Sequence, residues 1–355
     1  MKTKLVYVLT CAIEATYIEQ ASISIYSVHY HNPDAHIVLI VDDNTNDLLV
    51  GKRAEVLEYI TEKVVISFED TTSTPMYRSR YIKTQVRELV DGDLLFIDSD
   101  TVINHSLEEI DQLPYDVAAV PESNLPIAEF HPALYKPMCE TAQKMGWNLA
   151  GEEYYFSSGV IYAKDTPQAH QLFQLWHQYW QDGLKLEVRI DQPALAKANI
   201  ECGHLIQLMD NRWNCIMFTY PRTAKEAYIL HFAAFRNMSF LFSKRVLGYI
   251  KENGLTDYIK DYIVHPCNSY IPFDSEFYHY RLMDYIKRFK ILNKGVRDYA
   301  DNVDTTFVDY IPKNIICSFL QNKCYALAVV AMLFLKWKRI QVNKNYKYKE
   351  NICAK

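Results

Sequence analysis

The sequence lacks the signatures of several common protein classes. Its eight cysteines are scattered, and none forms a C-x-x-C pair or a zinc-binding spacing. Neither a disulfide scaffold nor a zinc module is therefore indicated, and reduced thiols in the cytoplasm are the simpler interpretation. The chain also contains neither G-x-G-x-x-G nor G-x-x-x-x-G-K-S/T, so a dinucleotide-binding fold and a P-loop have no support.

Long apolar runs are absent as well. No stretch reaches the roughly 20 apolar residues of a membrane-spanning helix, and the longest candidate is residues 324–335. The N-terminus, MKTKLVYVLTCA, imitates a short signal peptide with a lipid-modified cysteine. Its apolar run over residues 5–9 is too short, and Thr10 stands where a smaller residue is preferred. We therefore expect a buried first strand there.

An excess of positive charge is also missing. The 355 residues have a net charge of −5, and binding to nucleic acid, which needs a basic face, is not expected. Apolar residues make up 49% and charged residues 23%, as in globular proteins that bury a core. At roughly 150 residues per domain, this length predicts about two domains or one large α/β domain.

The average charge hides an asymmetry at the C-terminus. Residues 336–355 hold seven Lys/Arg and one acid, while residues 1–335 have a net charge of −11. The apolar run 324–335 runs directly into Lys336-Trp337-Lys338-Arg339, residue types that favour an anionic membrane surface. We predict a peripheral enzyme on the cytoplasmic face of the membrane. The alternative is a core helix followed by a solvated tail.

The first hundred residues alternate between strand and helix patterns. Apolar runs at 5–10, 36–41, 64–68 and 94–97 predict four strands, the first of them buried. Residues with helical spacing lie between them, at 18–28, 56–60 and 82–89. Strand starts about 30 residues apart are typical of βαβ units, so we predict an α/β fold with a mostly parallel sheet. Ligands of such sheets bind beyond the carboxyl ends of the strands.

The pattern changes after that point. Strands are predicted at 117–120, 156–162 and 228–232, and helices at 167–180 and 191–198. Beyond residue 240 the chain is helical in pattern and rich in tyrosine. We therefore predict a principal α/β domain over 1–240, a helical extension over 241–322 and an apolar-basic tail over 323–355.

The most informative stretch is LLFIDSDTVI, in which a buried strand leads into Asp98-Ser99-Asp100. In extended backbone, residues two apart point to the same side, so Asp98 and Asp100 can share one cation while Ser99 faces away. Mg²⁺ and Mn²⁺ prefer such oxygen ligands. The alternative is an acidic loop at a sheet edge. By contrast, Asp91-Gly92-Asp93 precedes its strand and is predicted to be a solvated turn.

Five motifs in order extend this interpretation: IDSD, EEYYFSSGVIYA, IDQPAL, NRWN and ILHFAAF. Together they resemble glycosyltransferase family 8, the retaining sugar transferases related to lipopolysaccharide galactosyltransferases and glycogenin. The resemblance covers roughly residues 5–237. It implies a GT-A-type nucleotide-sugar-binding fold, with the region after residue 240 as a helical C-terminal extension.

The resemblance assigns three metal ligands. Asp98 and Asp100 resemble the family's carboxylate ligands, and His231, after the strand YIL, resembles the third. A neutral imidazole suits Mn²⁺ better than Mg²⁺, so Mn²⁺ is the expected cofactor. Without the motif order, a core histidine at a strand end is the simpler interpretation of His231.

The resemblance also implies the contacts to the donor. Tyr17 resembles the residue that stacks on uracil, and Glu14 stands where the family often has an aspartate that accepts a uracil N–H. Lys83 and Arg80 resemble basic residues near the diphosphate and sugar. For these residues helix-face packing or solvation is the alternative. The expected nucleotide-sugar contacts are Ala12, Glu14, Thr16, Tyr17, Arg80, Lys83, Asp98, Ser99, Asp100, Ser157 and Arg236.

Asp191 and Gln192 resemble the catalytic pair beside the anomeric carbon. Gln192 would place its carboxamide oxygen near that carbon, and Asp191 would orient sugar hydroxyls. An amide is a poor nucleophile, so this pair suits front-face attack by the acceptor better than double displacement.

Three departures from the family concern the donor sugar and its diphosphate. Ser157 stands in place of an asparagine, and Pro193 in place of a second aspartate. Residues 233–237 replace a small loop with glycine and lysine, and Arg236 would supply the diphosphate charge from a shifted position.

The sequence as a whole predicts a metal-dependent retaining glycosyltransferase. It would move a hexose from a UDP-sugar to a glycan or lipid-linked acceptor, with the metal neutralising the UDP leaving group. One alternative is a noncatalytic nucleotide-sugar or glycan binding module on the same fold. A glycoside hydrolase is the other, but no carboxylate pair suited to it is evident.

Overall fold

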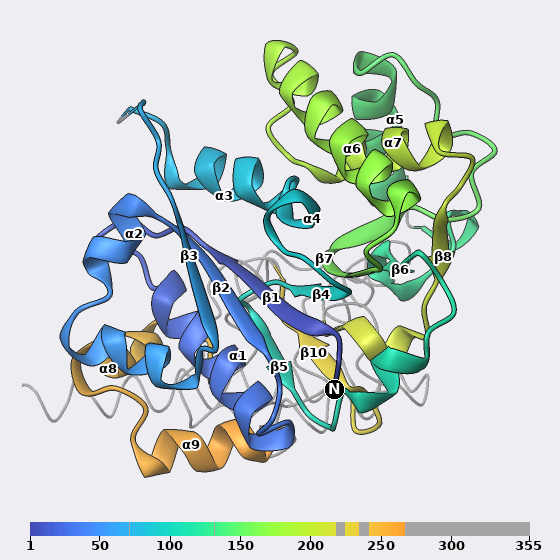
Figure 1. Cartoon of the computed structure of the whole chain (residues 1–355). Coiled ribbons are helices and arrows are strands. Elements are labelled where there is room, and N and C mark those ends of the chain that lie inside the picture. Colours follow the sequence, from blue (N-terminus) through green and yellow to red (C-terminus); the bar gives the residue numbers. More distant parts are fainter. Residues whose placement is uncertain (71, 131, 218–223, 234–240, 267–355) are drawn as a thin grey trace, which may run out of the picture. The chain divides into compact units, whose positions relative to one another are not determined.

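A computed structural model of the chain describes residues 1–266 except 71, 131, 218–223 and 234–240 (Figure 1). Its centre is a seven-stranded sheet with the order β3-β2-β1-β4-β7-β6-β8. Only β7 runs against its neighbours β4 and β6, so the predicted mostly parallel sheet is confirmed. The strands are β1 (Lys4–Leu9), β2 (Ile37–Asp42), β3 (Glu62–Ile66), β4 (Leu94–Ile97), β6 (Val117–Pro121), β7 (Phe156–Ala163) and β8 (Ile206–Leu208).

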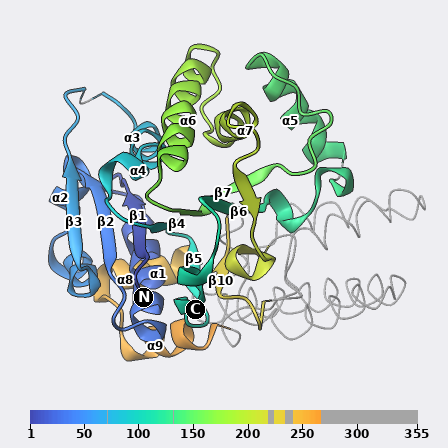
Figure 2. The same ribbon diagram turned by 45° about the vertical axis from the view of Figure 1, so that its right-hand side comes forward.

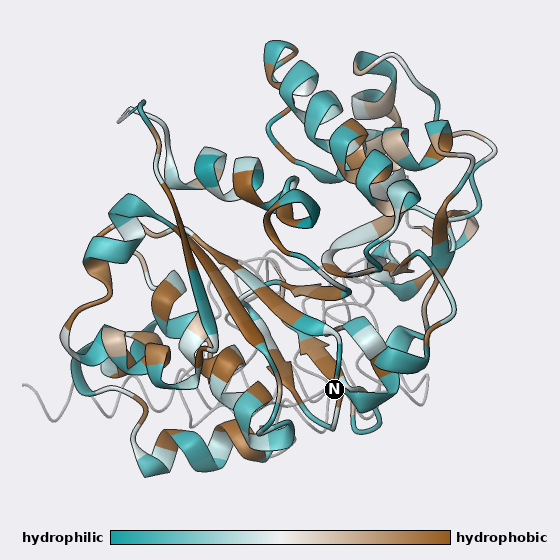
Figure 3. Cartoon of the chain, viewed as in Figure 1, coloured by the Kyte–Doolittle hydropathy of each residue, from teal (hydrophilic) through white to brown (hydrophobic). Residues whose placement is uncertain are grey.

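Different helices cover the two faces of the sheet. Successive side chains of a strand point to opposite faces, so each strand contributes to two cores. On β1, Leu5, Tyr7 and Leu9 face helix α1 (Tyr17–His31), while Val6 belongs to a second core. The second core contains α6 (Pro167–Lys185) and α7 (Gln192–Glu201), which lie side by side (Figure 2). Figure 3 shows the strands as the most continuously hydrophobic segments of the described fold.

Several expected elements differ in detail. The short helix expected near 56–60 is the last part of a 3-10 helix, η1 (Gly51–Tyr59), which ends just before Ile60. The helix expected over 82–89 is two helices, α3 (Pro75–Lys83) and α4 (Val86–Leu89). They separate at Thr84, whose hydroxyl contacts the Arg80 carbonyl and, at 2.7 Å, Nδ1 of His177 on α6. A side chain bonded to its own helix and to a neighbouring one favours a helix end there.

The remaining helices were not predicted, or extend beyond the predicted ranges. Proline at the first turn starts both α3 and α6, each after a threonine whose hydroxyl accepts a backbone N–H. The other elements are α2 (Asp43–Leu48), α5 (Pro132–Lys144), and the 3-10 helices η2 (Glu108–Gln112), η3 (Glu122–Asn124), η4 (Ile127–Glu129) and η5 (Asn211–Asn214).

After β4 the chain enters a second sheet of three short strands. Its order is β5 (Thr101–Ile103), β10 (Ile229–His231) and β9 (Cys215–Ile216). Residues 98–100 form a turn that carries the chain from β4 into β5. The expectation that Asp98 and Asp100 share a side of one extended strand is therefore wrong. The two carboxylates are brought together by the turn between two sheets.

Beyond residue 240 the structure describes two helices, α8 (Lys244–Asn253) and α9 (Asp257–Val264). They pack on α1, and α8 also packs on η1, with Leu247, Ile250 and Ile263 buried. The domain boundary at 240 stays a prediction, and the extension beyond 266 and the apolar-basic tail lie outside the described residues. Among the residues described, no helix has the length and hydropathy needed to span a bilayer.

Candidate active site

Asp98, Asp100 and His231 converge where β4 ends and the small sheet begins. Each offers one ligand atom, and these atoms lie within 4.8 Å of one another. Asp100 and His231 are buried, with Oδ1 of Asp100 3.3 Å from Nε2 of His231, while Asp98 is partly exposed. Two carboxylates and an imidazole around one point form a donor set that suits a divalent transition-metal cation.

His231 is held from its other side as well. Its Nδ1 lies 2.9 Å from Oδ1 of the buried Asn214. Burial lowers the pKa of His231, but the hydrogen bond to Asp100 and the charges of Asp100 and Asp98 outweigh burial and leave the pKa above its ordinary value. The imidazole is therefore surrounded by groups that fix its orientation and favour a positive charge beside it.

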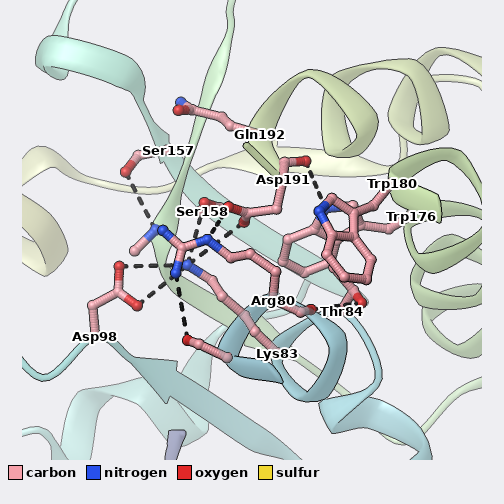
Figure 4. A network of polar contacts seen from close by, with 12 residues as sticks. Arg80, Lys83, Thr84, Asp98, Ser157, Ser158, Trp176, Trp180, Asp191 and Gln192 are labelled. Carbon is pink, nitrogen blue, oxygen red and sulfur yellow. Dashed lines mark hydrogen bonds and ion pairs between the residues drawn. The ribbon is translucent and has the colours of Figure 1, made fainter. Parts of the chain in front are cut away.

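A network of charges lies next to these three residues (Figure 4). The buried ammonium of Lys83 lies 3.2 Å from Oδ1 of Asp98, 3.7 Å from Oδ2 of Asp191 and 3.3 Å from Oγ of Ser158. Nε of Arg80 lies 2.9 Å from Oδ1 of Asp191. Two predicted donor-binding cations, Lys83 and Arg80, and the predicted catalytic residue Asp191 thus lie next to the predicted metal ligands.

The two carboxylates of this network differ in their surroundings. Burial acts to raise the pKa of Asp191, but Lys83, Arg80 and a hydrogen bond from Ser158 hold the pKa below its ordinary value. For Asp98, removal from water is the larger effect, and its pKa is raised despite the attraction of Lys83. Asp191 is therefore a stable anion, while Asp98 is the carboxylate that gains most from an additional cation.

Gln192 is oriented by its amide nitrogen. Nε2 donates to Oε2 of Glu122 at 2.7 Å and to the carbonyl of Phe156 at 2.9 Å. With both amide hydrogens engaged, the carboxamide oxygen must point away from these two acceptors. Pro193 occupies the first turn of α7, where its missing N–H leaves no bond unmade, which accounts for a proline directly after the pair.

The segment after β1 supplies the predicted uridine contacts. Ala12, Glu14 and Tyr17 are exposed and Thr16 is half-buried. Interactions from other elements hold this segment: Arg53 donates to the Ala15 carbonyl at 2.7 Å, and Nζ of Lys251 to the Ile13 carbonyl at 2.9 Å.

The three remaining predicted donor contacts, Ser99, Ser157 and Arg236, differ in their positions. Ser99 is half-buried in the turn between the sheets. Ser157 is buried, with its hydroxyl 3.4 Å from Nδ2 of Asn214. Arg236 lies outside the described residues. A cavity of about 480 Å³ between η1, α8 and α9 includes none of the predicted site residues.

Sequence reasoning missed three side chains of the site. Ser158 adjoins Ser157 in the motif FSSG, Asn214 ends NRWN, and Glu122 follows the carboxyl end of β6. Since β6 points the same way as β1 and β4, the strand-end rule that identified Asp98 could also have identified Glu122.

Known structures resemble the chain at low identity. Mouse xyloside xylosyltransferase 1 in its apo form is 14% identical, with 66% of this chain and 98% of that chain covered and a TM-score of 0.44. Galactosyltransferase LgtC, in complex with donor and acceptor sugar analogues, is 15% identical, with 65% and 87% covered and a TM-score of 0.46. Apo GlyE of Streptococcus pneumoniae TIGR4 is 16% identical, with 75% and 63% covered and a TM-score of 0.44.

No curated protein matches the chain at a significant level. The family model described as glycosyl transferase family 8 matches residues 8–235, well over half of the chain. This stretch contains every predicted site residue except Arg236. The predicted resemblance and the α/β GT-A-type fold class are thereby confirmed, and the chain belongs to glycosyl transferase family 8.

Proposed function

We propose that this transferase is a metal-dependent retaining hexosyltransferase that uses a UDP-sugar. The observation that carries the proposal is the convergence of Asp98, Asp100 and His231 beside the cationic side chains of Lys83 and Arg80. A diphosphate leaving group needs positive charge on several sides, and here cationic side chains and a metal-ligand set adjoin each other.

The metal-ligand set fits Mn²⁺, or Mg²⁺, on chemical grounds. Asp98, Asp100 and His231 would hold the ion, which when bound supplies charge neutralisation for the departing UDP. The raised pKa of Asp98 supports this, because a carboxylate that is costly to ionise alone is stabilised by a second cation. Lys83, whose ammonium lies 3.2 Å from Oδ1 of Asp98, would add a second positive charge for the diphosphate.

Gln192 and Asp191 would act on the sugar. The bonds from the Gln192 amide to Glu122 and Phe156 hold its oxygen in one orientation, which suits stabilisation of positive charge on the anomeric carbon. Asp191, kept ionised by Lys83 and Arg80, would accept hydrogen bonds from sugar hydroxyls. The acceptor hydroxyl would then attack from the face that UDP leaves, which retains the α configuration.

The proposed substrates and location rest on the predicted nucleotide contacts and on the C-terminal tail. Tyr17 and Glu14 would contact the uracil, Ala12, Thr16 and Ser99 the rest of the nucleotide, and the acceptor would be a glycan or a lipid-linked glycan. A lipid-linked acceptor would suit a cytoplasmic protein that attaches peripherally to an anionic membrane through its apolar-basic tail, residues 323–355.

Release of UDP from a panel of UDP-hexoses in the presence of Mn²⁺ tests this function. We expect one donor to support turnover, first as slow hydrolysis and faster with a suitable glycan acceptor. Binding of a UDP-sugar without turnover, with any acceptor extract, would instead indicate a noncatalytic binding module and contradict the proposal.

A further inference from the structure

Asn214 is a buried amide that contacts a predicted metal ligand but is not itself one. It is the last residue of η5 and is fully buried. Its Oδ1 lies 2.9 Å from Nδ1 of His231, and its Nδ2 donates to the hydroxyl of Ser157 at 3.4 Å. The side chain thus joins the predicted metal ligand to β7, the strand of the FSSG motif.

This contact determines where the proton of His231 resides. An amide oxygen can only accept a hydrogen bond, so Nδ1 of His231 must carry the hydrogen. In the neutral imidazole the lone pair then lies on Nε2, which is the nitrogen that faces Asp100. This is the tautomer that can donate a lone pair to a cation beside Asp98 and Asp100.

The backbone of Asn214 is fixed independently of its side chain. Nδ2 of Asn124 donates to the Asn214 carbonyl at 2.8 Å, and Oδ1 of Asn124 accepts the N–H of Ile216 at 2.7 Å. Asn124 itself has φ +54°, a left-handed conformation that asparagine adopts more readily than most residues. A substitution at Asn214 would therefore leave the local backbone in place while changing the group that Nδ1 of His231 contacts.

We propose that Asn214 is a positioning residue of the metal site. By accepting the Nδ1–H bond it fixes both the tautomer and the rotation of His231, so that Nε2 is presented to the cation. This inference rests on the proposed metal dependence. Hydrogen-bond partners of ligating histidines typically change metal affinity by about 10–100-fold when removed, so the effect is measurable.

The test is a titration of the full-length protein with Mn²⁺ alone, followed by the electron paramagnetic resonance signal of the free ion. Asn214→Leu keeps the branched shape of the side chain and removes the acceptor, and we expect it to weaken Mn²⁺ binding by about 10–100-fold. Asn214→Asp restores an oxygen acceptor for Nδ1–H, and we expect binding within a few-fold of wild type. Asn214→Ser, too short to reach Nδ1, replaces the leucine variant if that variant does not fold.

Asn199→Leu is the matched control. Asn199 is another buried amide, at the far end of α7, whose Oδ1 accepts the Ile206 N–H at 2.8 Å. We expect it to lower stability but leave Mn²⁺ affinity unchanged. Two results would overturn the inference while the proposed function stands: Asn214→Leu binding Mn²⁺ as wild type does, or Asn214→Asp losing affinity as Asn214→Leu does. A wild-type protein that binds neither Mn²⁺ nor Mg²⁺ would overturn both.

Discussion

Gly159 of β7 lies so close to His231 that a Cβ at this position would be 2.3 Å from Cε1 of the imidazole and 3.0 Å from Oδ2 of Asp98. The Gly159 carbonyl also accepts the backbone N–H of Asp98 at 2.8 Å. The absence of a side chain at Gly159 is therefore what allows β7 to approach two predicted metal ligands at once.

Gly159→Ala should displace the imidazole of His231 and weaken Mn²⁺ binding by about tenfold or more. Loss of the hydrogen bond that orients a ligating histidine has an effect of this size, and displacement of the ring should cost at least as much. Overpacking should also cost about 1–3 kcal/mol of stability. Thermal unfolding and Mn²⁺ titration measure the two effects. Gly248→Ala, in open space on α8, is the control, and we expect its metal affinity to be unchanged. Wild-type Mn²⁺ affinity in Gly159→Ala would contradict the packing argument.

Gln192→Ala should lower kcat by about 10²-fold and change donor KM much less, since its oxygen acts mainly on charge that develops in the transition state. Steady-state kinetics with the preferred UDP-sugar measures this. Glu122→Ala releases the Gln192 amide and should have an effect of the same kind, whereas Glu122→Gln keeps an acceptor and should lose less than about tenfold. A Gln192→Ala variant altered only in KM would assign Gln192 to binding alone.

The product should keep the donor's α configuration. The carboxamide of Gln192 is a poor nucleophile, so in the proposed reaction the acceptor attacks on the face that UDP leaves. Proton NMR of the newly formed glycosidic bond measures the anomeric coupling directly. A β-linked product from a UDP-α-sugar is incompatible with this reaction path.

A pH-dependent contact joins α6 to α4 and to the connection between β7 and α6. His170 lies 2.9 Å from Asp165 and 3.0 Å from Glu88, and these hydrogen bonds raise the pKa of His170. Its contribution to stability is complete below the unfolded value of about 6.5 and is lost as the pH rises through the folded value.

The wild-type protein should therefore exceed His170→Gln in stability at about pH 5.5, by up to about 1 kcal/mol for this partly exposed group, and the difference should shrink at about pH 8. Chemical denaturation at the two pH values measures it. A difference that grows with pH would reverse the sign of the expected linkage.

Five strands of the large sheet could be predicted because each contains four or more consecutive apolar residues. β3 lies in the predicted run 64–68, although its side chains are exposed or half-buried. β5, β8 and β9 could not be predicted, since strands of two or three residues carry no pattern of their own. Helix α5 contains Pro137, which is unfavourable inside a helix and obscures its sequence signal. The break at Thr84 depends on His177, 93 positions away, and no local pattern predicts it.

The site residues could be predicted where acidic side chains directly follow a predicted strand. Asp98 and Asp100 stood out as two acids after β4, although a turn and not extended backbone brings them together. His231 depended on the order of the motifs, because a single histidine carries little information. Asn214 is a neutral amide that acts through a contact 17 positions away, which the sequence alone does not reveal.

The most direct test of the account is the metal dependence of UDP release. With EDTA, turnover of the preferred UDP-sugar should fall to background and should return on addition of Mn²⁺. Asp98→Asn and Asp100→Asn should each lose at least about 10²–10³-fold in kcat while the protein stays folded, because each removes a ligand of the group that neutralises the leaving diphosphate. Full activity in EDTA, or in either folded variant, would contradict the central claim.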